Sequence, residues 1–155
     1  MPARTQFDHE KLHVYQLQLD VIAWLSDLIA ELQNTKRARL AEVIDQLDRA
    51  SLSTLLNLAE GNGRRASQQR VRFFDDARGS ATECAACLDA LVAKKACEAR
   101  RVVEGKSKLL SVVSILSALI EKFGGNSIAS GMKAQRRSGE GEGMISAAHR
   151  VGVGV

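Results

Sequence analysis

The segment Leu47–Glu83 constrains the fold of this chain more than any other part of the sequence. It begins as a helical pattern, meets the turn Gly61-Asn62-Gly63 and two arginines, and restarts as a second helical pattern after Ser67. Glycine is a common residue just past a helix, and serine is a frequent N-terminal cap. We therefore predict two helices joined by a tight turn, with Gly61 ending the first and Ser67 capping the second.

Apolar residues recur every three or four positions in four long stretches, which is the spacing of an amphipathic helix. The predicted helices span residues 8–33, 36–60, from 67 to a break near 97–99, and 100–123. The single proline is Pro2, so no proline interrupts a helix. Long helices joined by short turns pack best as an antiparallel up-down-up-down four-helix bundle. The expected fold class is all-α, with the bundle domain over residues 1–123. The predicted core faces of the second and third helices are Leu40, Val43, Ile44, Leu47, Ala50 and Leu58, and Phe73, Ala77, Ala81, Cys84, Leu88 and Leu91.

The first and fourth helices carry more apolar surface than one core needs. At 100° per residue, the apolar residues from Leu109 to Ile120 cover about 220°, whereas a bundle core uses a stripe of roughly 100–150°. Another subunit is the usual cover for such a surface. We expect a homo-oligomer; the alternative is scattered exposed aliphatics, which are normal on protein surfaces. A similar excess surrounds the predicted core face of the first helix, which is Leu12, Tyr15, Leu19, Ile22, Ile29 and Leu32.

Residues 124–155 differ from the rest of the chain. Eight of its twelve glycines lie there, and no sustained period is present. We predict that Gly124-Gly125-Asn126 ends the fourth helix and that a disordered, Gly-rich basic tail follows. The tail is either a solvated end or a basic arm that contacts a partner.

Composition excludes several classes of protein. The net charge of +4 at pH 7 is mild and only weakly supports nucleic-acid binding. No apolar run approaches the roughly 20 residues of a membrane span, and no leader is recognisable, so we expect a cytoplasmic protein that does not enter a membrane. The chain has three cysteines, an odd number that suits reduced thiols rather than a disulfide framework. Cys84 and Cys87 lack the second pair of ligands that a zinc site needs, so we interpret them as core cysteines and expect neither a metal nor a cofactor. The sequence lacks the Glu-x-x-His pattern of di-iron bundles, and we expect that this protein is not an enzyme.

Four arginines at the turn between the second and third helices are candidates for nucleic-acid binding. They are Arg64, Arg65, Arg70 and Arg72. Arginine suits phosphate because its guanidinium donates bidentate hydrogen bonds. The alternative is a solvated end with salt bridges between subunits. A second basic cluster, Lys36, Arg37 and Arg39, is expected at the opposite end of an antiparallel bundle.

Polar residues on the second and third helices form a candidate network. We interpret them as a structural network that fixes helix register or subunit packing. A small-molecule site is the alternative, because Gly79 lacks a side chain and allows close approach of a helix or a ligand. The network residues are Arg49, Ser53, Asn57, Glu60, Arg78, Ser80 and Glu83.

These positions together resemble the bacterial ribosomal RNA intervening-sequence protein family, a family of four-helix bundles. The resemblance covers residues 7–123. The N-terminal part of the pattern is Phe7, Leu12, Val14, Tyr15 and Gln16. The central part is Leu47, Arg49-Ala50, Ser53, residues 57–61, Gly63-Arg64-Arg65, Arg72-Phe73, residues 77–80 and Glu83, in which Gly61, Gly63 and Gly79 are the turn and close-packing glycines.

The resemblance implies an antiparallel four-helix bundle that commonly assembles as a ring-like homopentamer. Some relatives are encoded inside ribosomal RNA genes, and related accessory variability proteins of retroelements bind reverse transcriptase and nucleic acid. Our first hypothesis is a non-enzymatic, homo-oligomeric cytosolic scaffold or regulator that binds an unidentified protein partner. The alternative is an RNA-binding accessory protein that uses the basic turn. A third reading is a small-molecule binder in the bundle or the ring channel.

Overall fold

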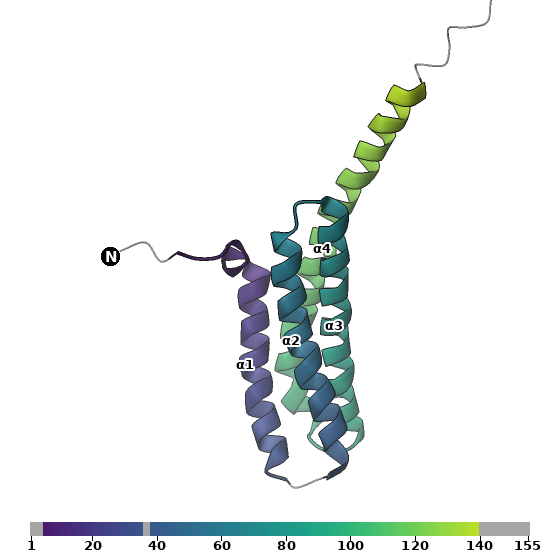
Figure 1. Ribbon diagram of the computed structural model, residues 1–155. Helices are drawn as coiled ribbons and strands as arrows, with labels where there is room; N and C mark the ends of the chain where they lie inside the picture. The colour runs from purple at the N-terminus through teal and green to yellow at the C-terminus, as the bar shows by residue number, and fades with distance from the viewer. Residues whose placement is uncertain (1–4, 36–37, 140–155) are drawn as a thin grey trace, which may run out of the picture.

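The computed structural model describes residues 5–35 and 38–139, and no β-strand occurs among them. Four long helices lie side by side, and a short 3-10 helix precedes each of the first two (Figure 1). The prediction of an all-α protein with four helices is confirmed. The elements are η1 (Asp8–Lys11), α1 (His13–Gln33), η2 (Ala38–Leu40), α2 (Ala41–Gly63), α3 (Ser67–Ala93) and α4 (Ala99–Gly139).

The helices surround a shared core. In Figure 1, α1 and α3 lie on the two flanks, α2 lies in front and α4 lies behind it. Helix α1 ends and α2 begins at the lower end, whereas α2 ends and α3 begins at the upper end. Helix α3 packs extensively against both α2 and α4, but α1 makes much smaller contacts with its neighbours α2 and α4. Helix α1 is therefore the least extensively packed of the four.

Each helix contributes one apolar stripe to the core, but the stripe on α1 is not the predicted one. Leu19 is 37% exposed, and Tyr15 and Ile22 are only half-buried. Helix α1 is apolar around most of its circumference, so the helical spacing fits more than one stripe, and its contacts with α2 and α4 decide which one is buried. The buried residues of α1 are Val14, Gln18, Val21, Leu25, Leu28 and Leu32.

The core faces of α2 and α3 agree better with the prediction. Leu40, Leu47, Ala50 and Leu58 are buried as expected. On α3 the one error is the phenylalanine, because Phe74 is buried and Phe73 is only partly covered. The buried residues of α3 are Phe74, Ala77, Ala81, Cys84, Leu88 and Leu91.

Several predicted helix ends were wrong. The first predicted helix begins as η1 and becomes α-helical only at His13. Gly61 does not end α2, which continues to Gly63, and the residue after the helix, Arg64, takes an extended backbone. Ser67 is the first residue of α3 rather than its cap, and no side chain caps that helix. No glycine described by the structure has a positive φ, so no glycine supplies the left-handed turn that would stop a helix.

The largest correction concerns residues 124–139. The predicted stop at Gly124-Gly125-Asn126 is wrong, because α4 continues as a helix to Gly139. A glycine inside a helix costs only about 1 kcal/mol relative to alanine, so two glycines weaken a helix without ending it. The last part of α4 projects beyond the other helices (Figure 1). Residues 140–155 of the predicted tail lie outside the described residues.

A tryptophan lying on a glycine joins α1 to α4. A Cβ atom at Gly105 would lie 2.1 Å from Cζ3 of Trp24, so the ring lies directly against the helix backbone. The guanidinium of Arg101 lies 5.2 Å from the centre of the same ring. Arg101 also donates two hydrogen bonds to the Glu31 carboxylate, at 2.6 and 2.9 Å. These contacts join α1 to the first two turns of α4.

The polar side chain of Gln18 is fully buried between α1 and α2. Gln18 Nε2 donates a hydrogen bond to the Ser51 carbonyl oxygen at 2.9 Å. Within the described part of the chain, Gln18 Oε1 is buried and has no hydrogen-bond partner. A buried acceptor without a donor costs roughly 1–3 kcal/mol, so this residue lowers the stability of the α1–α2 contact.

The α3–α4 connection turns through a left-handed residue that is not glycine. Lys95 has a φ of 58°, the only positive φ of a non-glycine residue in the described ranges. The Lys95 N–H donates to the Val92 carbonyl, and the Ala96 N–H donates to the Leu91 carbonyl, both at 2.9 Å. This pair of bonds is the Schellman motif that ends many helices, usually with glycine in the left-handed position.

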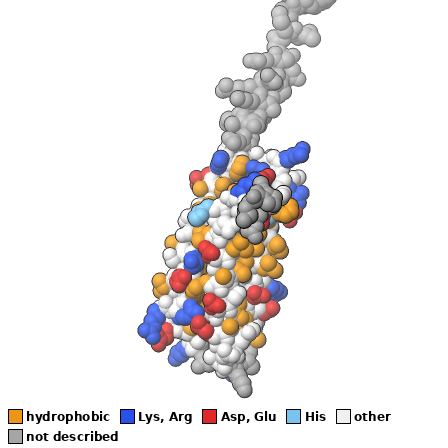
Figure 2. Space-filling view, turned by 90° about the vertical axis from the view of Figure 1, so that its left-hand side faces the viewer, with side chains coloured by type: hydrophobic (Ala, Val, Ile, Leu, Met, Phe, Trp, Pro, Cys, Tyr) orange, Lys and Arg blue, Asp and Glu red, His pale blue; other side chains and the backbone are white. Residues whose placement is uncertain are grey.

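Large apolar side chains remain on the surface. Leu52 and Leu56 on α2 are 51% and 58% exposed, and Val103 and Leu110 on α4 are 63% and 66% exposed. Figure 2 views the side on which α1 lies and shows hydrophobic side chains gathered along that face, interleaved with charged ones. Among the described helices, none combines the length and the apolar character needed to cross a membrane.

Candidate functional site

Arg64 closes the last turn of α2 and is held by its neighbours. Its backbone N–H donates to the Gly61 carbonyl oxygen at 3.2 Å. Its guanidinium pairs with Glu60 and lies 4.9 Å from the centre of the Phe73 ring. Part of the charge of Arg64 is therefore balanced within the chain.

Arg70 ties the α2–α3 turn to α3 and α4. Its Nε and Nη2 donate to the Arg64 carbonyl oxygen at 3.1 and 2.7 Å, and Nη2 also donates to the Asn62 carbonyl oxygen at 3.3 Å. Its guanidinium lies 4.6 Å from the centre of the Phe123 ring. The last carbonyl groups of a helix have no N–H donor within the helix, and here the Arg70 guanidinium is the donor. Its donors are thus directed at protein oxygens.

Arg65 and Arg72 are different. Both side chains are exposed. Within the ranges that the structure describes, neither guanidinium has a hydrogen bond or an ion pair. Of the four candidate arginines, these two are the ones that can approach a phosphate without first breaking a contact.

Arg39 is the described member of the second basic cluster, and it lies at the other end of α2. Arg39, in η2, is exposed and precedes α2, whereas Arg64 follows α2. A helix of 23 residues separates them, which corresponds to about 35 Å. The prediction that the two clusters lie at opposite ends is confirmed for Arg39; Lys36 and Arg37 lie outside the described residues.

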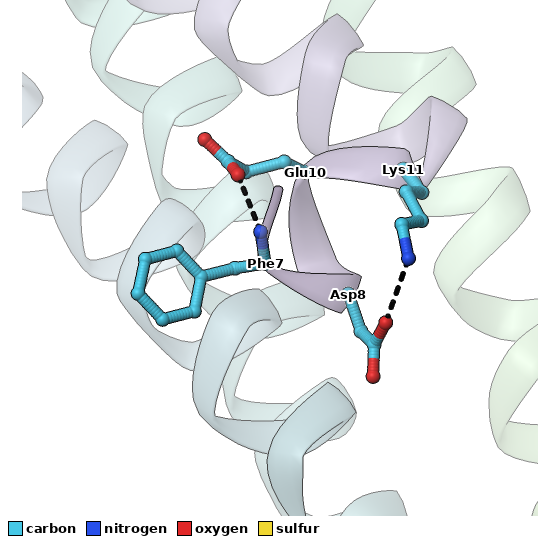
Figure 3. Close-up of polar contacts among 4 residues, drawn as sticks. All are labelled: Phe7, Asp8, Glu10 and Lys11. Carbon is cyan, nitrogen blue, oxygen red and sulfur yellow. Dashed lines mark hydrogen bonds and ion pairs between the residues drawn. The ribbon is translucent and has the colours of Figure 1, made fainter. Parts of the chain in front are cut away.

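The N-terminal segment meets the α2–α3 turn, which sequence spacing alone did not indicate. Together they form an open pocket of about 390 Å³. Figure 3 shows the N-terminal side of this arrangement: the Phe7 N–H donates to Glu10 Oε2 at 2.6 Å, and Lys11 Nζ contacts Asp8 Oδ1 at 3.0 Å. The pocket is lined by Phe7, Asp8 and His9 from the N-terminal segment, by Arg64, Arg65 and Arg70, and by Asn62 and Gly63 of the turn.

Part of the predicted polar network connects α2 and α3. The hydroxyl groups of Ser53 and Ser80 lie 3.0 Å apart, and Asn57 Nδ2 donates to Ser53 Oγ at 3.2 Å and to the Ser53 carbonyl at 3.0 Å. This group is half-buried and joins the two helices. A hydroxyl pair of this kind suits a role in helix register.

A second group of the same network includes a residue that the sequence analysis missed. Gln46 on α2 donates to Glu83 on α3 and accepts a hydrogen bond from Arg49 at 2.8 Å. Arg49 also pairs with Asp45 at 3.2 Å. Gln46 lies seven residues, or two helical turns, before Ser53, which is the spacing that would have identified it.

The remaining members do not join these groups. Arg78 pairs with Asp75 on its own helix at 2.6 Å, and Glu60 pairs with Arg64. The seven predicted residues are therefore divided among several local contacts rather than gathered in one site.

The three glycines have different roles. A Cβ at Gly61 would lie 2.9 Å from two carbon atoms of the Phe74 ring, so Gly61 lets α3 pack closely on α2. At Gly63 and Gly79 a Cβ would meet nothing within 4 Å. Gly79 is expected to allow close approach of a helix or a ligand; no helix approaches it among the described residues, because it lies on the exposed side of α3.

The cysteines are separate free thiols. Cys84 is buried, and burial is the main cause that raises the pKa of its thiol to about 12. Burial also raises the pKa of the half-buried Cys87 and Cys97. Across the described residues, no three histidine, cysteine or acidic side chains come together in a way that could hold a metal ion.

Comparison with known proteins identifies the family. Residues 10–118 match the protein-family model described as 23S rRNA-intervening sequence protein. A comparison with curated proteins found no match. The matched region includes α1, α2, α3 and most of the part of α4 that packs against them. Because it covers more than half of the chain and agrees with the four-helix fold, the chain belongs to the 23S rRNA-intervening sequence protein family.

Proposed function

We propose that this protein is a non-enzymatic, ring-forming homo-oligomer that acts in the cytoplasm as a scaffold or regulator through protein–protein contacts. In this proposal the bundle has up-down-up-down antiparallel topology, and the ring contains five copies, as the family resemblance implies. The free cysteines are compatible with a reducing compartment.

The observation that supports a ring is the position of the exposed aliphatic side chains. Leu52 and Leu56 lie one turn apart on α2, and Val103 and Leu110 lie two turns apart on α4. Helices α2 and α4 are on opposite sides of the bundle (Figure 1). A subunit with two different self-binding faces forms head-to-tail contacts, which close into a ring when the rotation between copies permits. A two-fold dimer would instead use one face twice.

Two variants test the head-to-tail arrangement. Leu56→Glu blocks the α2 face, and Leu110→Glu blocks the α4 face; each alone should give monomers by light scattering after gel filtration. An equal mixture should give 1:1 heterodimers, because one intact α2 face can still bind one intact α4 face. Ala86→Glu, at an exposed position of α3, serves as the control and should keep the wild-type mass.

The expected wild-type mass is five times the 16.8 kDa of the chain. A monomeric wild type would refute the assembly. A wild-type oligomer that both glutamate variants leave unchanged would refute these two faces as the contact surfaces.

RNA binding is the second candidate function, and the exposed arginines at the α2–α3 end favour it. Arg65 and Arg72, at one end of the bundle, have guanidinium groups that no side chain or carbonyl of the described residues engages. In a ring the pair would repeat around the axis, and weak phosphate contacts would add through multivalency. In a plot of the logarithm of the RNA-binding constant against the logarithm of the salt concentration, the slope should become shallower by about 0.7–0.9 for each phosphate contact that Arg65→Ala or Arg72→Ala removes. An unchanged slope would exclude both residues as contacts.

A further inference from the structure

The pocket between the N-terminal segment and the α2–α3 turn brings together an aromatic ring and cationic groups that are far apart in the sequence. Phe7 and Arg65 both line it, although 57 positions separate them. Its volume of about 390 Å³ lies within the range of small-molecule sites, roughly 300–1,000 Å³. It belongs to neither the core nor the apolar faces proposed for assembly.

Phe7 is the most exposed large apolar side chain among the described residues, at 74%. One face of its ring stacks on His9, with ring centres 5.5 Å apart and an angle of 12° between planes. His9 in turn contacts Tyr15, with ring centres 4.9 Å apart. Because His9 lies against one face of the Phe7 ring, the opposite face is the one that a planar ligand would contact. Such a supported aromatic ring can stack a planar ligand.

The charges around the pocket leave one arginine fully available. Arg64 pairs with Glu60, and Arg70 donates to backbone carbonyl groups. The Asp8 carboxylate, which also lines the pocket, contacts Lys11 at 3.0 Å, so its charge is partly balanced. Arg65 is exposed and without a partner in the described part of the chain. The pocket therefore combines an open aromatic face with an unengaged guanidinium.

We propose that this pocket binds one unpaired nucleotide, with its base stacked on the Phe7 ring and its phosphate bound by Arg65. A nucleotide is the ligand class that has both a planar π-face and a phosphate. Single-stranded RNA and a free mononucleotide share this chemistry, whereas a base inside a duplex has no free face. The proposal deepens the second candidate function, on which its single-stranded RNA form rests.

Fluorescence anisotropy with a fluorescein-labelled oligoadenylate of eight nucleotides tests the proposal. The same strand paired with oligouridylate gives the duplex probe, and unlabelled AMP gives the mononucleotide competitor. Phe7→Leu keeps apolar bulk but removes the aromatic face, and Phe7→Tyr restores it. Arg65→Ala removes the cation, and Arg39→Ala removes an exposed arginine at the opposite end as the matched control.

We expect the single strand to bind more tightly than the duplex. Phe7→Leu should weaken its binding at least about fivefold, because stacking of one base contributes roughly 1–3 kcal/mol. Arg65→Ala should also weaken it, because the variant loses the guanidinium that binds the phosphate. Phe7→Tyr and Arg39→Ala should bind like the wild type. If Phe7→Leu binds the single strand as tightly as the wild type, the proposal is wrong.

The arms of the experiment separate this proposal from RNA binding in general. Salt-dependent binding of both probes with no effect of Phe7→Leu would overturn the pocket and leave RNA binding in place. AMP binding that is lost in Phe7→Leu, without binding of either RNA, would support the pocket with a free nucleotide and overturn the RNA function. No binding of any probe would overturn both.

Discussion

The contact between Trp24 and Gly105 makes a sharp prediction about stability. A Cβ at position 105 would lie 2.1, 2.4 and 2.6 Å from Cζ3, Cη2 and Cε3 of the indole. Carbon atoms in contact prefer about 3.5–4.0 Å, so Gly105→Ala must displace the ring by at least about 1 Å. The displaced carbons belong to the indole of Trp24, which is rigid and is flanked by Arg101. A rigid ring cannot bend out of the way as the end of a flexible side chain would.

Two opposing terms set the size of the effect. Overpacking typically costs about 1–3 kcal/mol, and we expect the upper end because three ring atoms clash. Alanine in place of glycine inside a helix gains about 1 kcal/mol. The net expectation is that Gly105→Ala lowers the free energy of unfolding by about 2 kcal/mol.

Urea unfolding followed by far-UV circular dichroism measures this free energy, at one fixed protein concentration because an oligomer is stabilised by association. Trp24 is the only tryptophan in the chain, so its fluorescence emission reports directly on the ring, and a red shift is expected in Gly105→Ala. Gly79→Ala is the control. It also lies inside a helix, but its Cβ would meet nothing within 4 Å, so it should stabilise the protein by about 1 kcal/mol.

A double-mutant cycle tests the cause. In a Trp24→Ala background the clash is absent, so Gly105→Ala should become stabilising by up to about 1 kcal/mol. The sign of the effect therefore reverses between the two backgrounds. The reasoning would be refuted if Gly105→Ala stabilised the wild-type protein, or if it destabilised both backgrounds equally.

Four further predictions follow from single contacts. Lys95→Gly should raise the free energy of unfolding by about 1 kcal/mol, because glycine adopts a φ of 58° without the penalty of a side chain; a loss of stability would contradict the Schellman geometry. Gln18→Met should be neutral or stabilising by about 1 kcal/mol in the same denaturation assay, since it removes the buried Oε1 that has no partner in the described structure. Burial raises the pKa of the Cys84 thiol to about 12, so this thiol should resist iodoacetamide at pH 8 in the native protein and react once the protein unfolds. For the same reason, the free energy of unfolding should fall as the pH rises above the ordinary thiol pKa of 9.0. Iodoacetamide modification of Cys84 in the native protein, detected by mass spectrometry, would contradict this. The hydrogen bond from Arg101 lowers the pKa of the Glu31 carboxyl. This pair therefore stabilises the fold at pH values above the ordinary carboxyl pKa, and its contribution is lost as the pH falls through the lowered pKa. Arg101→Met should raise the pKa of Glu31 in an NMR titration.

The helices themselves could be read from the sequence because local spacing and composition determine them. Phe74 and Phe73 show where this information ends. Both fit an apolar stripe at helical spacing, and both approach Gly61, but Phe74 places its ring there and is buried, whereas Phe73 approaches only with its Cβ atom and stays partly exposed. A helical pattern identifies which residues share a face, whereas the neighbouring helix selects the face that is covered.

The candidate site was predictable in part. The arginine cluster at the α2–α3 turn was visible in the sequence, but the different roles of its members were not. Arg70 is bound to carbonyl oxygens at the end of α2, and Arg65 points to no protein partner in the described residues. A glycine in the sequence can mark either the end of a helix or a place where another element packs closely. Gly61 and Gly105 are of the second kind, because aromatic rings lie against them.

Residue order and local propensity are enough to predict four helices, their approximate positions, and the family pattern around the α2–α3 turn. Only the packed helices define which stripe of α1 is buried, where Trp24 packs, and that Phe7 and Arg65 line the same pocket. The physical reason is that contacts between segments distant in the chain depend on how whole helices approach each other. That approach is set by the summed packing of many side chains, which no single stretch of sequence contains.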